Sequence, residues 1–580
     1  MLRLWLAIVP VVCCSAFSFE QVLCPKVVFE TDEKLSFNST ETHLLCGDKN
    51  SEAWRTIPSW QAQFFLKSFL QDRGYYRSVY RTDKDRLHVS VGLPSHVTDI
   101  KVHGAQETAL EVKKKRDLIG RRLTPSVLTE IEKWVIEELQ AMGYACSKAQ
   151  SVADHSTGAI AVEVTLGKKL ALLSVQEDPV EGLRPGTLRR YDAFRIGEGF
   201  NSRLLKITEN RIVSQGVVGS VYFVPVCSGQ RAAVGQGAAV AQKVVAGRAR
   251  SVSIALGANT ELGPLTRVLW RHARLGANAS SIVATARASI IRQQLDVNSD
   301  WYFLPYPSRW FIRPHALIAH ENGEQYQSVS LRFGLGVART WDLTGWSVRL
   351  FTGPGFELIR TLRGGGLPLS HSLLLQSQLG VTTHSFEYYQ ASPRTGSQWI
   401  LSAQTNHRDF LSAFTAHKVS LQGQVLWNFK DFAPPLWVIG LRAGATVTLT
   451  PEQTGPDSPL PLPYRNFLGG SGNLRGFGRN ELPEGGAFKA TSVYLGWESR
   501  FGFFYKLKLE PLVFFDAGML GSASFSLEEP AFFSTGTGLR WESPIGVLRT
   551  TFARGFLSRK SADTEKLSHW QFYLSLGEEF

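Results

Sequence analysis

The sequence has no run of about 18 apolar residues beyond its N-terminal segment, and a membrane-spanning α-helix needs such a run. A helical membrane protein is therefore excluded. A protein without such helices can span a bilayer only with β-strands. In hydrocarbon every backbone N–H and C=O group of these strands must be hydrogen-bonded, and only a closed barrel achieves this. Residues 1–18 are predicted to be a secretory signal peptide, because Arg3 precedes the apolar stretch Leu4 to Val12 and Ala16 to Ser18 fits a cleavage site.

Motifs of catalysis and metal binding are also missing. The sequence contains no GxSxG, no HExxH and no P-loop with its lysine. Asp296, Asn298 and Asp300 resemble the opening of a calcium loop, but Trp301 stands where the sharp turn needs glycine. We therefore expect no enzyme activity, no cofactor and no metal site.

Cysteine is scarce. Cys24, Cys46, Cys146 and Cys227 remain after the predicted signal peptide, and none belongs to a CxxC pair, so zinc binding and thioredoxin-like chemistry have no basis. Cys24 and Cys46 are candidates for a disulfide bond in an oxidising periplasm. The alternative is that all four are separate small core residues.

Basic residues outnumber acidic ones, 63 to 50, which gives a net charge of +13. Basic chains often bind nucleic acid, but a secreted chain rarely meets one, so no nucleic-acid partner is expected. The densest basic run, Lys113 to Arg116, lies on a predicted helix. It is interpreted as a solvated helix face, and contact with anionic lipid head groups is the alternative.

The N-terminal part of the sequence contains an internal repeat. From about residue 26 to 226, short strands alternate with amphipathic helices at a period of roughly 75 residues. In the middle copy, a strand is predicted over 98–104, a helix from Thr124-Pro125 to Gly143-Tyr144, and a further strand over 158–166.

The other two copies follow the same order. In the first copy, a helix leads to Gly74-Tyr75-Tyr76, and a strand is predicted over 86–91. The third copy begins at Leu172, passes through Gly216-Val217 and ends with a strand predicted over 220–226. Three strand–helix–helix–strand–strand units are therefore predicted. The unit resembles the POTRA domain, since a Gly-aromatic turn follows the second helix in two copies.

After about residue 249 a two-residue alternation replaces the helical period. Over 437–449, Trp437, Ile439 and Leu441 lie on one face, and Gly440 and Arg442 lie on the other. Lipid on one side and water on the other explain this split, although a soluble sandwich would also alternate. Glycine and aromatic residues interleaved through about 330 residues favour a membrane β-barrel of about 16 antiparallel strands.

The predicted fold is thus a membrane β-barrel preceded by three α+β POTRA domains. The predicted boundaries are 1–18 for the signal peptide, 19–96, 97–168 and 169–248 for the POTRA domains, and 249–580 for the barrel.

Three stretches in the C-terminal part point to a family. Leu474-Arg475-Gly476-Phe477 lies in a Gly-rich loop, and Phe514 to Gly518 ends a strand. Gly536 to Trp541 runs into Ser543 to Arg549, and the chain finishes on the aromatic Phe580 after Phe572 to Gly577. Together and in this order they resemble the BamA/TamA superfamily of outer-membrane assembly and translocation barrels. Three POTRA-like units favour the TamA branch, because BamA relatives usually carry five and two-partner exporters carry two.

The resemblance implies a lock inside the barrel. In this family the loop arginine folds into the lumen and pairs with carboxylates, and the matching residues here are Arg475, Gly476 and Phe477. Counting by twos along the strands from lipid-facing residues places Glu498 and Asp516 inside the barrel, where they can receive the guanidinium.

The barrel must close by pairing its first strand, near 251–257, with its last, near 570–580. A weak seam is predicted there, because Ser575 and Gly577 offer little packing on the inner face and Ser251 and Ser253 are expected to match them. The predicted seam residues are Val252, Ile254, Leu256, Phe572, Leu574, Leu576, Gly577 and Phe580.

The resemblance also implies a function. The chain is expected to insert or secrete client β-barrel proteins, such as autotransporters, through the lateral seam. Its expected partners are unfolded outer-membrane clients, a TamB-like inner-membrane-anchored protein and outer-membrane lipids, with the barrel in the outer membrane and the POTRA domains in the periplasm. The alternatives are a two-partner-secretion exporter of one dedicated substrate and a passive or lipid-handling channel.

Overall fold

The computed structural model describes residues 19–576 apart from 25–26, 49–56, 85, 106–109, 111, 228–236, 324, 391–392, 430–436, 453–457, 503, 505–506, 544–545 and 559–569. The predicted signal peptide therefore lies outside the described residues. The chain divides into two compact units, Met1–Leu139 with Ser147–Leu166, and Gln140–Cys146 with Gly167–Phe580. No helix in the described part of the chain is long and apolar enough to span a bilayer.

The first module belongs to the first unit. Its elements are β1 (Phe19–Cys24), β2 (Val27–Thr31), α1 (Ser39–Cys46), α3 (Ser59–Gln71), β3 (Val79–Asp83) and β4 (Arg86–Ser90), and its sheet has the order β1-β2-β4-β3. β1 is an additional strand that the repeat pattern did not predict, and it pairs antiparallel with β2. The helices cover the sheet through a core that includes Leu66, Leu70, Leu87 and Val89.

The second module also lies in the first unit. It consists of β5 (Asp99–His103), α4 (Val112–Leu118), α5 (Pro125–Ala141), β6 (Lys148–Asp154) and β7 (Ala159–Thr165), with the sheet order β5-β7-β6. The predicted helix start is confirmed, since the Thr124 hydroxyl accepts a hydrogen bond from the amide of Val127. α5 buries Ile131, Trp134 and Val135 on one face, as its helical spacing predicts.

The third module belongs to the second unit and departs from the predicted pattern. It contains β8 (Ala171–Glu177), η2 (Thr187–Tyr191), α6 (Ser202–Ser214), β9 (Ser220–Val226) and β10 (Gly237–Val245), with the sheet order β8-β10-β9. The expected first helix is a single 3₁₀ turn. Gly182 and Gly186, both with positive φ, flank Pro185 in the preceding segment, so no longer helix can form there.

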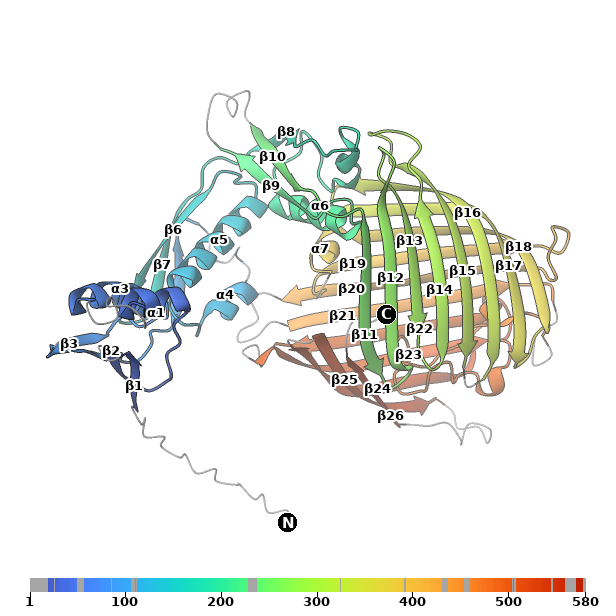
Figure 1. Ribbon diagram of the computed structural model, residues 1–580. Helices are drawn as coiled ribbons and strands as arrows, with labels where there is room; N and C mark the ends of the chain where they lie inside the picture. Colours follow the sequence, from blue (N-terminus) through green and yellow to red (C-terminus); the bar gives the residue numbers. More distant parts are fainter. Residues whose placement is uncertain are drawn as a thin grey trace, which may run out of the picture. The chain divides into compact units, whose positions relative to one another are not determined.

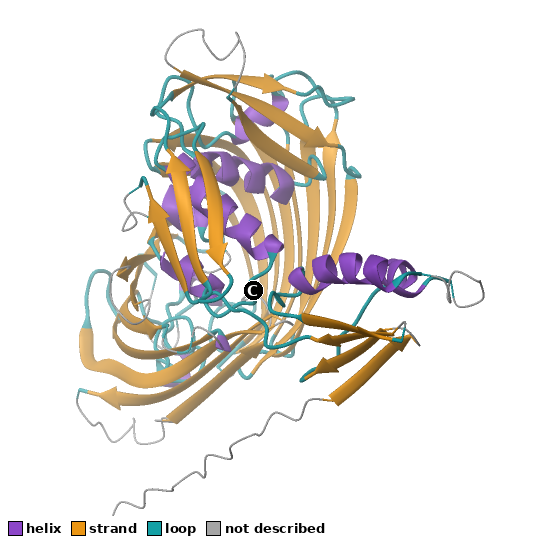
Figure 2. Cartoon of the chain, turned by 90° about the vertical axis from the view of Figure 1, so that its left-hand side faces the viewer, coloured by secondary structure: helices purple, strands orange, loops and turns teal. Residues whose placement is uncertain are grey.

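Sixteen antiparallel strands close into a barrel in sequence order (Figure 1, Figure 2). They are β11 (Arg250–Asn259), β12 (Gly263–Leu275), β13 (Ser280–Ala288), β14 (Arg292–Asp300), β15 (Trp310–Asn322), β16 (Gln327–Leu343), β17 (Trp346–Arg363), β18 (Leu369–Thr383), β19 (Gly396–Asn406), β20 (Ala416–Phe429), β21 (Trp437–Leu449), β22 (Thr491–Phe501), β23 (Leu509–Gly521), β24 (Glu528–Ser543), β25 (Gly546–Leu557) and β26 (Trp570–Leu576). A short helix, α7 (His384–Tyr388), lies between β18 and β19.

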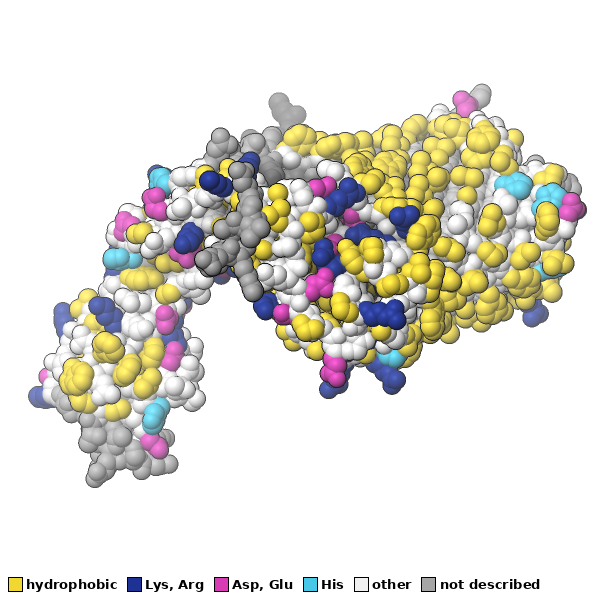
Figure 3. All heavy atoms as spheres, turned by 90° about the horizontal axis from the view of Figure 1, so that it is seen from above, with side chains coloured by type: hydrophobic (Ala, Val, Ile, Leu, Met, Phe, Trp, Pro, Cys, Tyr) yellow, Lys and Arg dark blue, Asp and Glu magenta, His cyan; other side chains and the backbone are white. Residues whose placement is uncertain are grey.

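The outer wall of the barrel is apolar. Alternate residues expose large hydrophobic side chains, as Val252, Ile254 and Leu256 do on β11. Figure 3 shows apolar side chains covering much of the barrel wall that faces the viewer. A wall of this kind is stable against hydrocarbon and would be unfavourable in water, so the alternation reflects a membrane barrel and not a soluble sandwich.

Two disulfide bonds join the four cysteines of the described residues. Cys24 pairs with Cys46 inside the first module, which resolves the alternatives left open by the sequence. Cys146, in the turn between α5 and β6, pairs with Cys227 at the end of β9. No local pattern predicts this second bond, because 81 residues separate its cysteines.

Candidate lumen lock and barrel seam

The long connection between β21 and β22 folds into the barrel. Its described part, residues 458–490, is called the lumen loop here. Its apolar side chains are almost completely buried, namely those of Leu460, Tyr464, Leu468, Leu474, Phe477, Leu482 and Phe488. Several of them pack against Leu520 of β23 and Phe532 of β24, so the loop forms a small core with the inner wall.

Arg475 lies at the centre of this loop and is 4% exposed. Its Nε and Nη2 donate to the two carboxylate oxygens of Asp516 over 2.9 and 2.8 Å. Its Nη1 donates to Glu498 Oε2 over 2.5 Å, and its backbone amide also donates to Asp516. The structure thus brings together the three charged residues that the family resemblance and strand alternation selected. A bidentate pair of this kind fixes both position and orientation.

Further residues support the lock, and sequence reasoning missed them. Arg500 donates from Nε to Glu498 Oε1 over 2.6 Å, and the Ser534 hydroxyl donates to Asp516 over 3.2 Å. The Arg475 guanidinium lies 3.5 Å from the centroid of the Phe514 ring, a cation–π distance. Phe514 precedes Asp516 by two residues, so both side chains face the lumen.

Gly476 is required by a close backbone approach. A Cβ at this position would lie 2.5 Å from the backbone nitrogen of Gly555 on β25, which is far too close. The next residue, Phe477, is fully buried and packs edge-on against Phe532 with ring centroids 5.8 Å apart. The glycine therefore brings the loop against the wall, and the phenylalanine holds it there.

The seam is the contact between β11 and β26. It consists of two residue pairs among the described residues, Ala258 with Leu576 and Asn259 with Ser575. By comparison, β11 pairs with β12 through ten residues and β25 pairs with β26 through seven. The hydroxyl and amide of Thr260 add contacts to the backbone of Phe572 and Leu574. Figure 1 shows β26 approaching the C-terminal end of β11.

One expectation about the seam is wrong. Ser251 and Ser253 do not face Ser575, because Ser575 lies opposite Asn259, eight and six residues further along β11. Alternation fixes the face of a strand on which a residue lies, but a shift of the register by an even number of residues preserves every face. Alternation therefore predicted correctly which side chains face the lumen and which face outward. It did not predict the register between β11 and β26.

The other predicted seam residues lie as follows. Val252, Ile254, Leu256, Phe572 and Leu574 are exposed on the outer wall, and Leu576 is half-buried. Gly577 and Phe580 lie outside the described residues.

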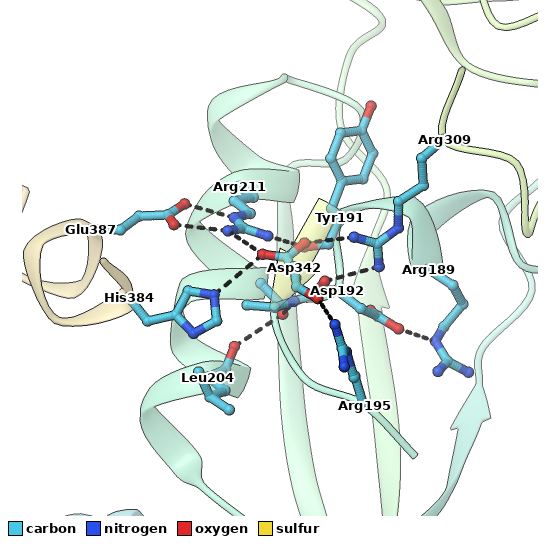
Figure 4. A network of polar contacts seen from close by, with 12 residues as sticks. Arg189, Tyr191, Asp192, Arg195, Leu204, Arg211, Arg309, Asp342, His384 and Glu387 are labelled. Carbon is cyan, nitrogen blue, oxygen red and sulfur yellow. Dashed lines mark hydrogen bonds and ion pairs between the residues drawn. The ribbon is translucent and has the colours of Figure 1, made fainter. Parts of the chain in front are cut away.

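A second polar cluster joins the third module to the barrel (Figure 4). Asp342, at the end of β16, accepts hydrogen bonds from Arg211 Nη2 at 2.8 Å and from Arg309 Nη1 at 2.5 Å. His384 of α7 approaches the same carboxylate at 3.3 Å. Arg211 also binds Glu387 through two bonds of 2.6 and 2.8 Å. This module junction fastens α6 to the turns of β16–β17 and β18–β19.

The junction extends to the segment around Asp192. Arg309 donates to the Asp192 backbone carbonyl over 3.0 Å, and Arg189 forms an ion pair with the Asp192 carboxylate. Burial raises the pKa of Asp192 to about 7, against the effect of Arg189. The sequence offered no signal for this cluster, because its members are distant in the chain and belong to no motif.

Beneath the module junction the barrel contains a cavity of about 700 Å³. Five arginines and two carboxylates line it, Arg190, Arg211, Arg309, Arg313, Arg349, Asp300 and Glu387. The cavity walls are thus polar and carry an excess of positive charge.

These features define the class of the protein: a closed 16-stranded membrane β-barrel with α+β modules in front of it and a loop locked inside its lumen. The barrel from β18 onward, residues 371–580, matches the family model of the Omp85 superfamily domain.

Solved structures with a similar chain course accompany this match. BamA from Haemophilus ducreyi lacking POTRA domains 1–3 has a TM-score of 0.50 at 14% identity, over 83% of this chain and 99% of that chain, and it shares the fold. CdiB from Acinetobacter baumannii has a TM-score of 0.46 at 14% identity, over 89% and 98%. CdiB from Escherichia coli has a TM-score of 0.45 at 14% identity, over 89% and 97%.

Proposed function

We propose that this protein is a non-catalytic outer-membrane factor that inserts or translocates client polypeptides through the seam between β11 and β26. The observation that carries the proposal is the contrast in strand pairing. Among the described residues, which end at Leu576, two residue pairs join β11 to β26, whereas β11 pairs with β12 through ten residues and β25 pairs with β26 through seven. Few of these described hydrogen bonds must break for the seam to open, and the exposed strand edges can then template an incoming strand.

The mechanism follows from strand chemistry. A client strand that pairs with β11 or β26 enters the bilayer with its backbone groups already satisfied, so the cost of unpaired N–H and C=O groups in hydrocarbon is avoided. Folding of the client supplies the driving force, and no nucleotide is needed. The modules lie in the periplasm and offer sheet edges, such as β6 and β9, to unfolded clients or to a TamB-like partner anchored in the inner membrane.

A disulfide lock across the seam tests the proposal. Ala258→Cys with Leu576→Cys places two thiols on directly opposed residues of an antiparallel pair, a spacing that a disulfide can bridge. The oxidised variant should lose the ability to assemble an autotransporter barrel into proteoliposomes, and reduction should restore it. Ser253→Cys with Leu269→Cys is the matched control, since it locks β11 to β12, a pair that need not open. Normal client assembly by the locked seam would rule the gate out.

A two-partner exporter and a lipid-handling channel are the alternatives. Depletion of the protein, followed by proteomics and lipid analysis of the outer membrane, separates the three. Loss of several β-barrel proteins is the result expected from an assembly factor. Loss of one large secreted protein indicates an exporter, and altered lipid content with unchanged proteins indicates lipid transport.

A further inference from the structure

The lumen loop touches both sides of the seam. On the first side is Glu261, in the turn that follows β11. Its carboxylate accepts hydrogen bonds from the backbone amide of Ser471 at 3.1 Å and from the Ser471 hydroxyl. The fit is close, because a Cβ on the adjacent Gly470 would lie 2.4 Å from Glu261 Oε1. Both hydrogen bonds end on the carboxylate of one side chain, so together they fix the position of Ser471.

On the other side is Tyr573, in the middle of β26. Phe572 and Leu574 point outward, so Tyr573 points into the lumen, where it is 9% exposed. Its hydroxyl donates to the backbone carbonyl of Phe477 over 2.7 Å. Phe477 follows Arg475 by two residues, so the last strand of the barrel is bonded directly to the segment that the lock holds.

Among the described residues, these contacts are comparable in number with those of the strand pairing itself. That part of the seam has two ladder pairs, and the loop adds three hydrogen bonds that bridge the same closure. A cavity of about 220 Å³ lies against them, lined by Thr260, Glu261, Gln571 and Tyr573 among others. Water in a polar cavity of this size can replace a broken hydrogen bond, so these contacts can be released without leaving buried groups unpaired.

We propose that the lumen loop is a brace across the seam, held by Glu261 on one side and Tyr573 on the other, and that a client enters only when this brace is released. Glu261 and Tyr573 are positioning residues, since they act on the strands through the loop. The proposal rests on the proposed function, because it assigns the regulation of the same seam. It also links the Arg475 lock to the gate: displacing the lock pulls Phe477 away from β26.

Hydrogen exchange in proteoliposomes tests the brace with the full chain. Tyr573→Phe removes only the hydroxyl, and Glu261→Ala removes the acceptor of Ser471. In each variant, the amides of residues 570–576 and of the end of β11 should exchange about fivefold faster than in the unmodified protein, as expected for the loss of a hydrogen bond worth about 1 kcal/mol. Amides of β15 and β16 should exchange at an unchanged rate.

Two matched controls are available. Tyr222→Phe alters an exposed tyrosine of β9, outside the barrel, and Glu452→Ala removes a carboxylate that binds Arg408 away from the seam. Both should leave exchange at residues 570–576 unaltered. Ser471→Ala is a milder variant on the Glu261 side and should raise exchange in the same place if Glu261→Ala prevents folding, which the heat-modifiable gel shift reveals.

The outcomes separate the brace from the proposed function. Exchange at β26 equal to that of the unmodified protein in both Tyr573→Phe and Ser471→Ala overturns the brace, whether or not the gate exists. Client assembly by the oxidised Ala258→Cys, Leu576→Cys variant overturns the gate, whatever the exchange rates show.

Discussion

Arg475 is enclosed by Asp516, Glu498 and the Phe514 ring, and its burial decides what its removal costs. Deleting Arg475 removes the bidentate partner of Asp516 and leaves Arg442, 3.6 Å away, as a weaker one in a low dielectric. Asp516 is completely buried, so it cannot turn to water instead.

Arg475→Ala should therefore lower the free energy of unfolding of the barrel by about 3–5 kcal/mol. Urea titration followed by the heat-modifiable gel shift measures the change. Arg479→Ala is the control, because this neighbouring arginine in the same loop is more exposed and reaches Glu321 over 3.4 Å. Equal stability of the two variants would contradict the lumen lock.

The raised pKa of Asp192 predicts that the stability of the third module depends on pH. Its folded pKa is raised to about 7, above the unfolded value near 4, so the folded chain binds more protons than the unfolded chain between these pH values. Stability contributed by Asp192 is present below about pH 4 and is lost as the pH rises to about 7.

Hydrogen exchange of residues 187–214 in detergent at a series of pH values, corrected for the intrinsic exchange rate, should show this loss as a falling free energy of opening. Asp192→Asn cannot ionise and should lack that part of the slope. Asp178→Asn, at an exposed position of the same module that pairs with Lys243, should keep it. A slope that is unchanged in Asp192→Asn would refute the assignment.

Single residues of the candidate site could be predicted from the sequence where strand alternation or a sequence motif determines their position. Strand alternation placed Glu498 and Asp516 inside because the period of two fixes the face of each residue. It could not predict that Gly476 meets Gly555, since the contact joins a loop to a strand distant in the sequence. The register of β11 against β26 could not be predicted either, because alternation does not distinguish registers that differ by two residues.

Among the elements, α6 has the clearest mechanical role, because its Arg211 joins β16 and α7 through Asp342 and Glu387. The module junction makes the third module and this part of the barrel a continuous structure. Helix α6 also contributes Leu205 and Ile212 to the core of the module. A change at the junction is therefore transmitted into the module itself.

Arg211→Ala should loosen α6 and α7 by about 3 kcal/mol of local opening free energy, because two carboxylates lose their shared cation. Hydrogen exchange of residues 202–214 and 384–388 measures the loosening. Lys206→Ala on the same helix removes an exposed lysine paired with Glu209 and should change exchange by less than about 0.5 kcal/mol. Identical exchange in the two variants would show that the junction does not hold the helix.

Elements with a strong period were predicted from the sequence, and those without one were not. The boundaries of α5 and of β4, β5, β7 and β9 lie within about two residues of the expected ranges, within the usual fraying of element ends. β1 and η2 escaped prediction. β1 is a strand outside the repeat, and glycine and proline in the segment before η2 override the helical pattern of the other two copies.

The molecule as a whole combines a closed wall with an occupied interior. Alternation over more than 300 residues was enough to predict the closed barrel, since no other arrangement of strands satisfies the backbone in lipid. The lumen loop was predicted only through its motif. Its burial depends on the fit of many apolar residues to the inner wall, which no local pattern encodes.

An occupied lumen should conduct ions poorly. In planar bilayers the protein should show small and irregular currents, because residues 458–490 fill part of the interior. Replacing residues 467–482 with a short Gly-Ser linker should give larger and steadier currents. A linker of the same composition replacing residues 408–413, between β19 and β20, is the control and should leave the currents small. Large, steady currents in the unmodified protein would favour a passive channel.

The Cys146–Cys227 bond has a mechanical consequence. It joins two cysteines of the same compact unit that are 81 residues apart, so the chain from the end of α5 to the end of β9 forms a closed loop. A closed loop has fewer unfolded conformations than an open one, and a loop of this length makes unfolding less favourable by about 4 kcal/mol. The bond therefore limits how far this stretch of chain can be drawn out when a client pulls on it.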